Sequence, residues 1–162
     1  LALNLDNDIN SQPKYYTPNN NLIFNATVSE ILKMDGVKEN QQNKANNEIV
    51  SIKKIIDSKP KNTSWSHTII NSDSNSATLI AQLPGEGNRM HFHPDWNEWW
   101  YIIKGSWEWN IEGNKKIINE GEVIYIEKNK KHRITAIGKK MSIRLAVSRY
   151  DVDHVYTEKD YS

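Results

Sequence analysis

Short apolar or alternating runs follow one another along the chain from about Trp65 onward, and turn signals separate them. The breaks include Pro84-Gly85, Pro94-Asp95 and Gly113-Asn114. Many short strands at near-regular spacing are typical of an all-β sandwich or barrel. The pattern predicts strands over 65–70, 77–83, 90–93, 98–104, 107–111, 115–118, 123–126, 132–137 and 141–149.

The first part of the chain, residues 1–62, has a different texture and is rich in Asn, Lys, Ser and Gln. Such polar stretches bury too little apolar area to order themselves. A short helix is predicted near 27–35, where apolar residues recur at helical spacing before Gly36. The segment 48–58 fits a helix by the spacing of its isoleucines and a strand by its β-branched content, and Pro60 ends it in either case.

These differences divide the chain into three parts: a polar N-terminal extension (1–62), a β-barrel domain (63–150) and a polar C-terminal tail (151–162), which we expect at the surface. A length of 162 residues suits one domain with such an extension. The net charge is +1, from 21 basic and 20 acidic residues. We therefore expect no nucleic-acid partner, because binding a phosphate backbone needs concentrated Lys and Arg.

The chain also lacks features that mark several other classes of protein. It has no Cys, which excludes disulfides, thiolate catalysis and Cys-ligated metal. No apolar run approaches the ~20 residues of a membrane span, and no signal-peptide pattern occurs, so we expect a cytoplasmic protein without a membrane partner. The chain begins with Leu1 rather than Met, and a leader removed before Leu1 would leave no trace in it.

Three histidines and one glutamate have the spacing of a metal site. His91 and His93 are two residues apart in a predicted strand, so their side chains point to the same face. Glu98 opens the next strand after a turn, and His132 begins a later one. Imidazoles with a carboxylate suit Fe(II), Mn(II), Ni(II), Zn(II) or Cu(II), and in an octahedral ion they leave two positions open.

At these residues the chain resembles the cupin superfamily, over about 65–149. The first cupin motif, G-x5-H-x-H-x3,4-E-x6-G, is matched at every fixed position, by Gly85, His91, His93, Glu98 and Gly105. The second, G-x5-P-x-G-x2-H-x3-N, is matched by Gly121 and His132, with Glu127, Asn129 and Ala136 at its Pro, Gly and Asn positions. The resemblance implies a double-stranded β-helix, a jelly-roll barrel that holds a metal ion in its mouth.

Three tryptophans are candidates for binding a substrate beside that ion. Trp107 and Trp109 alternate in one strand, and the resemblance implies that residues at these positions look into the barrel. Trp100 shares a strand face with Glu98. The alternative is that these rings simply fill the barrel core.

Two arginines of the β-barrel domain are expected to have different roles. Arg89 lies two residues before His91, and we expect it to share the ligand face and to bind a substrate carboxylate or phosphate through its bidentate fork. Arg144 lies between Ile143 and Leu145 and is expected to point away from whichever face those two bury, so it is only a surface charge if they face the barrel interior.

The remaining histidines, His67 and His154, lie outside both motifs, and we expect each to be a surface or turn residue.

Together these patterns predict a metal-dependent cupin enzyme that acts on a small organic acid, with Fe(II) favoured and Mn, Ni or Zn as alternatives. One reaction type is dioxygenation, because the string 89–93 followed by 98–101 resembles the ring-cleaving 3-hydroxyanthranilate dioxygenases. The chain departs from them in having His91 where they carry Asp, and in one residue fewer before the Glu. The other type is lyase or isomerase chemistry, with Tyr125 as a base.

The alternative class is a non-catalytic cupin module that binds a small ligand. Cupins also pair through an outer sheet or exchange N-terminal segments. We therefore predict a homodimer in which residues from 1–62 pack across a neighbouring copy.

Overall fold

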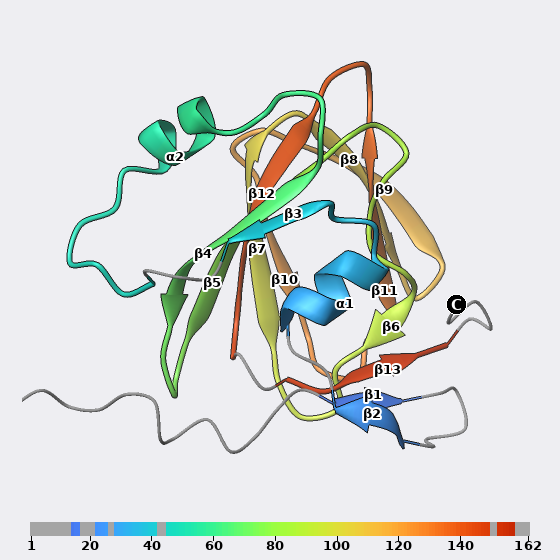
Figure 1. Ribbon diagram of the computed structural model, residues 1–162. Helices are drawn as coiled ribbons and strands as arrows, with labels where there is room; N and C mark the ends of the chain where they lie inside the picture. The colour runs from blue at the N-terminus through green and yellow to red at the C-terminus, as the bar shows by residue number, and fades with distance from the viewer. Residues whose placement is uncertain (1–13, 17–21, 26–27, 42–44, 150–151, 158–162) are drawn as a thin grey trace, which may run out of the picture.

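Two β-sheets face one another and enclose the core of the protein (Figure 1). The structure is a computed structural model, and it describes residues 14–16, 22–25, 28–41, 45–149 and 152–157. The prediction of an all-β barrel is confirmed by the two sheets. No helix among the described residues is long and apolar enough to cross a membrane.

The first sheet has seven strands in the order β2-β1-β13-β6-β11-β8-β9. Its strands are β1 (Lys14–Tyr16), β2 (Leu22–Asn25), β6 (His91–Phe92), β8 (Ser106–Ile111), β9 (Asn114–Asn119), β11 (His132–Ile137) and β13 (His154–Tyr156). Strand β11 is interior to the sheet and pairs antiparallel with both β6 and β8.

The second sheet has six strands in the order β10-β7-β12-β5-β4-β3. Its strands are β3 (Glu39–Gln41), β4 (Trp65–Asn71), β5 (Ser76–Gln82), β7 (Glu98–Lys104), β10 (Val123–Ile126) and β12 (Ser142–Ser148). Strand β12 is interior to the sheet and pairs antiparallel with β5 and β7.

Each of the predicted strands has a counterpart among β4 to β12, and three of them have the predicted bounds. The structure adds short strands that the pattern did not predict, of which β3 pairs parallel with β4, and β13 pairs with both β1 and β6. Val155 and Tyr156 of β13 are buried, so this part of the expected surface tail is instead built into the sheet. The division of the chain into three parts stays a prediction.

Both helices come from the polar first part. Helix α1 (Val28–Met34) ends where predicted, because Gly36 has φ +90° and its N–H donates to the Lys33 carbonyl while Val37 N–H donates to the Leu32 carbonyl. The segment 48–58, which fitted either a helix or a strand, contains helix α2 (Ile52–Ser58). The side chain of Ser51 caps this helix by accepting a hydrogen bond from the Lys54 N–H.

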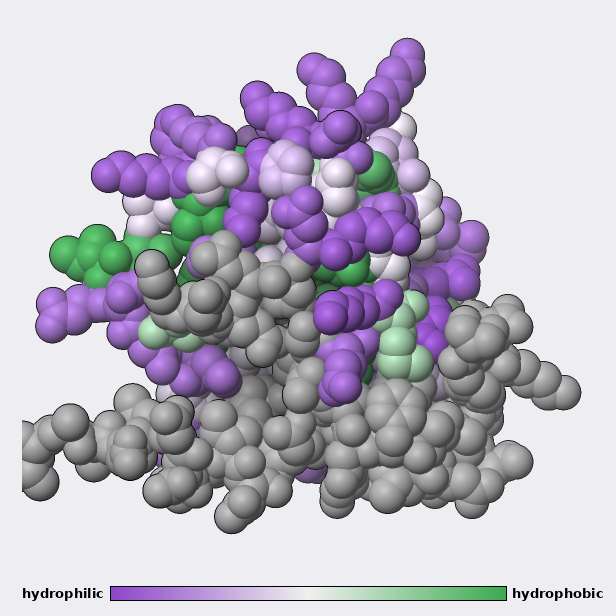
Figure 2. Space-filling view, viewed as in Figure 1, coloured by the Kyte–Doolittle hydropathy of each residue, from purple (hydrophilic) through white to green (hydrophobic). Residues whose placement is uncertain are grey.

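The apolar side chains form two main clusters on opposite faces of the six-stranded sheet. The interior cluster fills the barrel and includes Trp100, Trp107 and Trp109. The outer cluster includes Ile143 and Leu145 of β12 together with the partly buried isoleucines of α2, which lies against the outside of this sheet (Figure 1). Both faces of β12 are therefore buried. Elsewhere, the described residues on the face in Figure 2 are mainly hydrophilic.

Candidate metal centre

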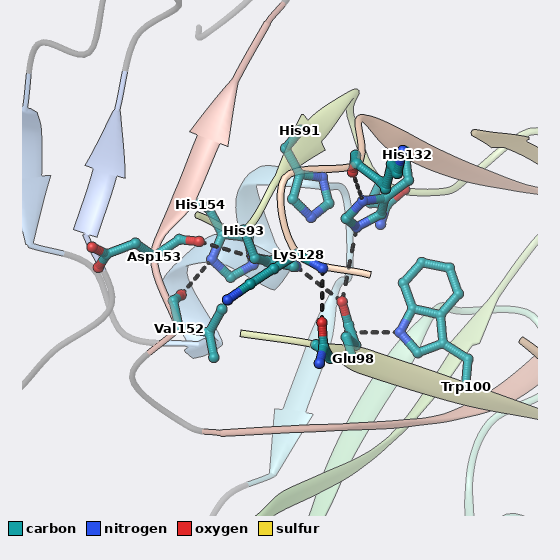
Figure 3. A network of polar contacts seen from close by, with 12 residues as sticks. His91, His93, Glu98, Trp100, Lys128, His132, Val152, Asp153 and His154 are labelled. Carbon is teal, nitrogen blue, oxygen red and sulfur yellow. Dashed lines mark hydrogen bonds and ion pairs between the residues drawn. The ribbon is translucent and has the colours of Figure 1, made fainter. Parts of the chain in front are cut away.

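The predicted metal ligands come together in the structure, although they belong to separate strands. His91 opens β6 and lies opposite His132 in the pairing of β6 with β11. The ring centroid of His91 lies 4.9 Å from that of His93 and 4.3 Å from that of His132. One ligand nitrogen from each of the three lies within 4.8 Å of the others, and all three side chains are buried. Figure 3 shows the three rings gathered together with the carboxylate of Glu98.

Glu98, the first residue of β7, completes this group from the opposite sheet. Its Oε2 lies 2.9 Å from His93 Nε2 and 3.8 Å from His132 Nε2. Its Oε1 accepts a hydrogen bond of 2.5 Å from the indole Nε1 of Trp100. The carboxylate is therefore oriented by Trp100 and directed at the imidazoles.

Backbone carbonyls fix the orientation of each imidazole. Nδ1 of His91 donates to the Arg89 carbonyl and Nδ1 of His132 donates to the Lys130 carbonyl, both at 2.7 Å. Nδ1 of His93 donates to the Asp153 carbonyl at 2.9 Å. A hydrogen bond at Nδ1 sets the tautomer and leaves Nε2 to bind a metal ion.

Burial sets the protonation of two of these imidazoles. Burial, together with the nearby His93, lowers the pKa of His132 to about 4. Burial also lowers the pKa of His91 well below its usual value, aided by the charges of His132 and His93. Both rings are therefore neutral at pH 7, which is the form that binds metal.

His93 and Glu98 behave differently because they are paired. Burial alone would raise the pKa of Glu98, but the hydrogen bond and charge of His93 lower it to about 2. Burial would lower the pKa of His93, and the same pairing with Glu98 raises it instead. The pairing therefore favours a protonated His93 beside an ionised Glu98.

The residues present fit a divalent transition metal. His132 Nε2 is buried and has no hydrogen-bond partner in the described part of the chain, which is costly unless an ion or a ligand satisfies it. The donor set of three imidazole nitrogens and one carboxylate suits such an ion.

A cavity of about 90 Å³ adjoins these residues. Its wall includes His91, His93 and Glu98 at one side, and Trp100, Arg144 and Asp35 elsewhere. Asp35 follows helix α1, whose Ile31 and Leu32 also line the cavity, so this helix covers part of it.

Of the three predicted tryptophans, only Trp100 lines the cavity. Trp107 and Trp109 belong to the interior cluster and are almost fully buried. The ring centroid of Trp109 lies 5.6 Å from that of His132, so this indole packs beside the histidine cluster. Their position agrees with the alternative in which these two rings fill the core.

In the structure Arg144, and not Arg89, lines the cavity, which is the reverse of the prediction. Arg89 does not line the cavity; its Nε donates to Asp35 Oδ1 at 2.9 Å and its guanidinium lies 4.4 Å from the ring centroid of Tyr156. Arg144 is buried and lines the cavity. The reason is that Ile143 and Leu145 pack in the outer cluster rather than in the barrel, so Arg144 points inward.

The predicted base, Tyr125, is not part of this group. Along β10 the buried Ile124 and Ile126 alternate with outward residues, and the Tyr125 side chain is 62% exposed. It pairs across the sheet with Trp99, also on the outer surface. This position argues against a base role for Tyr125.

His154 was expected at the surface but belongs to the site. Its ring stacks on His91 at 5.0 Å and meets His93 edge-on at 4.6 Å, and it lines the cavity. Burial lowers its pKa to about 3, with a further contribution from His93. The apolar residues of the run 152–156 were the sequence signal for strand β13, which carries it. His67, by contrast, lies on β4 and is not part of the histidine cluster.

Comparison with known proteins identifies the family. A family model described as a cupin domain matches residues 67–148, which is half of the chain, and the protein therefore belongs to the cupin family. A search of curated proteins found no match.

Solved structures share the fold at low sequence identity. An uncharacterized conserved protein with a double-stranded β-helix domain from Klebsiella pneumoniae superposes with a TM-score of 0.60 at 18% identity, covering 70% of this chain and 93% of that one. TT1209 from Thermus thermophilus gives 0.56 at 17%, covering 64% and 98%. A putative sugar phosphate isomerase from Acidithiobacillus ferrooxidans gives 0.54 at 15%, covering 62% and 73%. The architecture is therefore the double-stranded β-helix of cupins.

Proposed function

We propose that this cupin is a metal-dependent enzyme that acts on a small organic acid. The observation that carries the proposal is the buried His132 Nε2, which has no hydrogen-bond partner among the described residues and lies near nitrogens of His91 and His93 that could bind the same ion. A structural histidine in a core would have its second nitrogen satisfied by the protein. The adjoining cavity is lined by His91, His93 and Glu98, so a ligand bound there would lie beside this cluster.

In this proposal His91, His93, His132 and Glu98 hold the ion. When bound, the ion would supply Lewis acidity toward a carbonyl or carboxylate oxygen. The protein holds His91 and His132 in their neutral form with Nε2 free, through hydrogen bonds from Nδ1 to backbone carbonyls, and Trp100 orients Glu98. The burial of these groups limits the access of bulk water, which strengthens each electrostatic contact with the substrate.

The size of the cavity supports a small substrate. The cavity volume of about 90 Å³ is only several times the roughly 10–15 Å³ that one water molecule needs. Such a cavity suits an organic molecule of a few non-hydrogen atoms. The shared fold with a putative sugar phosphate isomerase does not assign that activity here, because a fold alone does not define a reaction.

Between the two reaction types we favour dioxygenation with Fe(II). The donor set suits iron no better than manganese, nickel or zinc, so the preference rests on the resemblance of the sequence around the first motif to the ring-cleaving dioxygenases. The lyase or isomerase route was tied to Tyr125 as base, and this side chain lies on the outer surface of β10. That route therefore lacks its proposed proton acceptor.

The test begins with metal analysis of protein purified without chelator or histidine tag. Oxygen uptake and product formation are then measured with a panel of small 2-oxo, 2-hydroxy and phenolic acids. Bound iron with oxygen uptake that depends on one acid supports the proposal. Zinc, nickel or manganese with turnover but no oxygen uptake transfers the assignment to lyase or isomerase chemistry, and metal-loaded protein that binds an acid without turnover supports the non-catalytic module.

The homodimer and the cytoplasmic location are further parts of this proposal. In this homodimer residues from 1–62 pack across a neighbour, in addition to the packing of α1, β3 and α2 on the protein's own barrel. Analytical ultracentrifugation tests it, since a monomer at micromolar concentration contradicts it.

A further inference from the structure

Arg144 is an arginine buried inside the barrel, at the centre of the six-stranded sheet. Its strand, β12, lies between β5 and β7, and the neighbouring Ile143 and Leu145 pack in the outer cluster. The Arg144 side chain therefore points into the barrel, where it lines the same cavity as His93 and Glu98 and is 2% exposed.

Among the described residues Arg144 has no carboxylate at ion-pair distance, although the charges of Glu98 and Asp35 in the same cavity act on it. Its Nη1 donates to Gln82 Oε1 at 2.6 Å, and its guanidinium lies 5.1 Å from the ring centroid of Trp100 and 4.7 Å from that of Trp107. Its Nε is buried and has no hydrogen-bond partner within the described part of the chain. The aromatic faces attract the cation but cannot accept that N–H in place of an oxygen.

Two nearby arginines show how the protein treats such charges elsewhere. Arg89 forms an ion pair with Asp35 at 2.9 Å, and Arg149 approaches Asp95 at 3.3 Å. Both are more exposed than Arg144, which has no carboxylate at ion-pair distance among the described residues. A charged side chain is almost never fully buried unless it is paired, because desolvating it costs several kcal/mol.

We propose that Arg144 is the anion-binding residue of the cavity and holds the carboxylate of the substrate, while the other end of the substrate faces the histidine cluster. That the bound carboxylate belongs to a substrate rests on the proposed function, whereas the binding of a carboxylate by Arg144 does not. Because the cavity is small, the carboxylate and the group that meets the histidines must be close in the molecule. The ligand class is therefore a short acid that carries a carbonyl or hydroxyl group near its carboxylate.

The experiment compares small acids with their uncharged amides. Native protein, both metal-loaded and chelator-treated, is titrated calorimetrically with pyruvate, glycolate and acetate and with pyruvamide, glycolamide and acetamide. We expect at least one acid to bind about 10- to 100-fold more tightly than its amide, the range that charge-assisted hydrogen bonds produce. If no acid binds in preference to its amide, the proposal is overturned without any variant.

Variants then assign the preference to a residue. Arg144→Gln should lose about 10- to 100-fold in affinity for the preferred acid and little for its amide. Arg133→Gln is the matched control, since Arg133 is a half-buried arginine of β11 that does not line the cavity. Arg144→Lys keeps the charge but loses the planar fork and should give an intermediate loss, which serves if Arg144→Gln does not fold.

The outcomes separate this inference from the proposed function. Acid binding that needs Arg144 in protein that binds no metal keeps the anion site and removes the metal-dependent enzyme. Acid binding that needs metal and is unchanged in both Arg144 variants removes the anion site and keeps the metal site. Metal content measured on every sample decides between these two results.

Discussion

The two ends of the cavity respond to burial in opposite ways. At the imidazole end, formed by His91, His93, His132 and Glu98, burial lowers the pKa of His132 to about 4 and makes it a neutral ligand. At the guanidinium end, formed by Arg144 with Gln82, burial lowers the pKa of Arg144 only to about 10, so it stays charged. The same desolvation acts on groups whose ordinary pKa values are 6.5 and 12.5.

This difference has a functional consequence. Neutral imidazoles with a carboxylate attract a cation, whereas a permanent guanidinium with no carboxylate at ion-pair distance among the described residues attracts an anion. A cavity with both ends is suited to a ligand that carries an anionic group and a neutral oxygen donor. The two ends should therefore be separable by experiments that remove one and leave the other.

The largest expected effect is on metal affinity when His132 is replaced. His132→Ala removes the ligand that the second motif contributes, and we expect metal affinity to fall by one to several orders of magnitude, since even groups that only orient ligands contribute about 10–100-fold. Metal titration followed by calorimetry measures it.

Two further variants control this experiment. His132→Gln keeps more of the buried volume and should lose metal to a similar degree, which separates the loss of a ligand from the loss of packing. Thr135→Ser, on the same strand, should bind metal as the native protein does. If His132→Ala binds metal as tightly as native protein, the four-ligand site is incorrect, and His154 becomes the histidine to test, because it contacts the cluster.

Metal removal should act on stability through the imidazole end alone. The ligands come from β6, β7 and β11 and the segment beside them, so a bound ion ties the two sheets together. Binding to the folded state alone stabilises it by about 4 kcal/mol at a free metal concentration 1,000-fold above Kd. Chelation should lower the melting temperature of native protein and leave that of His132→Ala nearly unchanged. Equal melting of loaded and chelated native protein would contradict the site.

A third prediction concerns pH and Asp35, near the guanidinium end. Burial raises the pKa of Asp35 to about 6, although the charges of Arg89 and, more weakly, Arg144 lower it. Between about pH 4 and pH 6 Asp35 stays protonated in the folded state but loses its proton in the unfolded state. The contribution of Asp35 to the free energy of unfolding therefore falls as the pH rises from about 4 to 6.

Asp35→Asn removes this titration. The free energy of unfolding of native protein, relative to the variant, should fall by up to about 3 kcal/mol between pH 4 and pH 8, at about 1.4 kcal/mol per pKa unit. Urea unfolding of metal-free protein across this range measures it. A difference that is constant with pH, or that grows as pH rises, contradicts the raised pKa.

The smallest expected effect is at Tyr125, which belongs to neither end. Tyr125→Phe removes an exposed hydroxyl and should change the free energy of unfolding by less than about 0.5 kcal/mol. Turnover of the acid identified by the activity screen should also be unchanged. A loss of tenfold or more in turnover, with metal content unchanged, would restore Tyr125 as a candidate base.

Much of the imidazole end could be predicted because its spacing is local. His91 and His93 share a strand face by the two-residue period, and the turn between them and Glu98 is short. The distant His132 was placed by the resemblance to the second motif, and its pairing opposite His91 supplies the geometry. By contrast, β13 and its His154 carried only a weak signal, because a three-residue strand is too short to show a period.

By itself, the sequence determined the all-β fold, the positions of β4 to β12 and the shared face of His91 and His93, since alternation and turn spacing are properties of neighbouring residues. Only the tertiary structure decided which way Arg144 points. Alternation places Arg144 on one face of the strand and Ile143 and Leu145 on the other. In a strand that is buried on both faces, alternation does not show which face lies in the barrel interior. Helix α2 packs over Ile143 and its neighbours on the outside, and that contact, between segments far apart in the chain, leaves the interior face to Arg144.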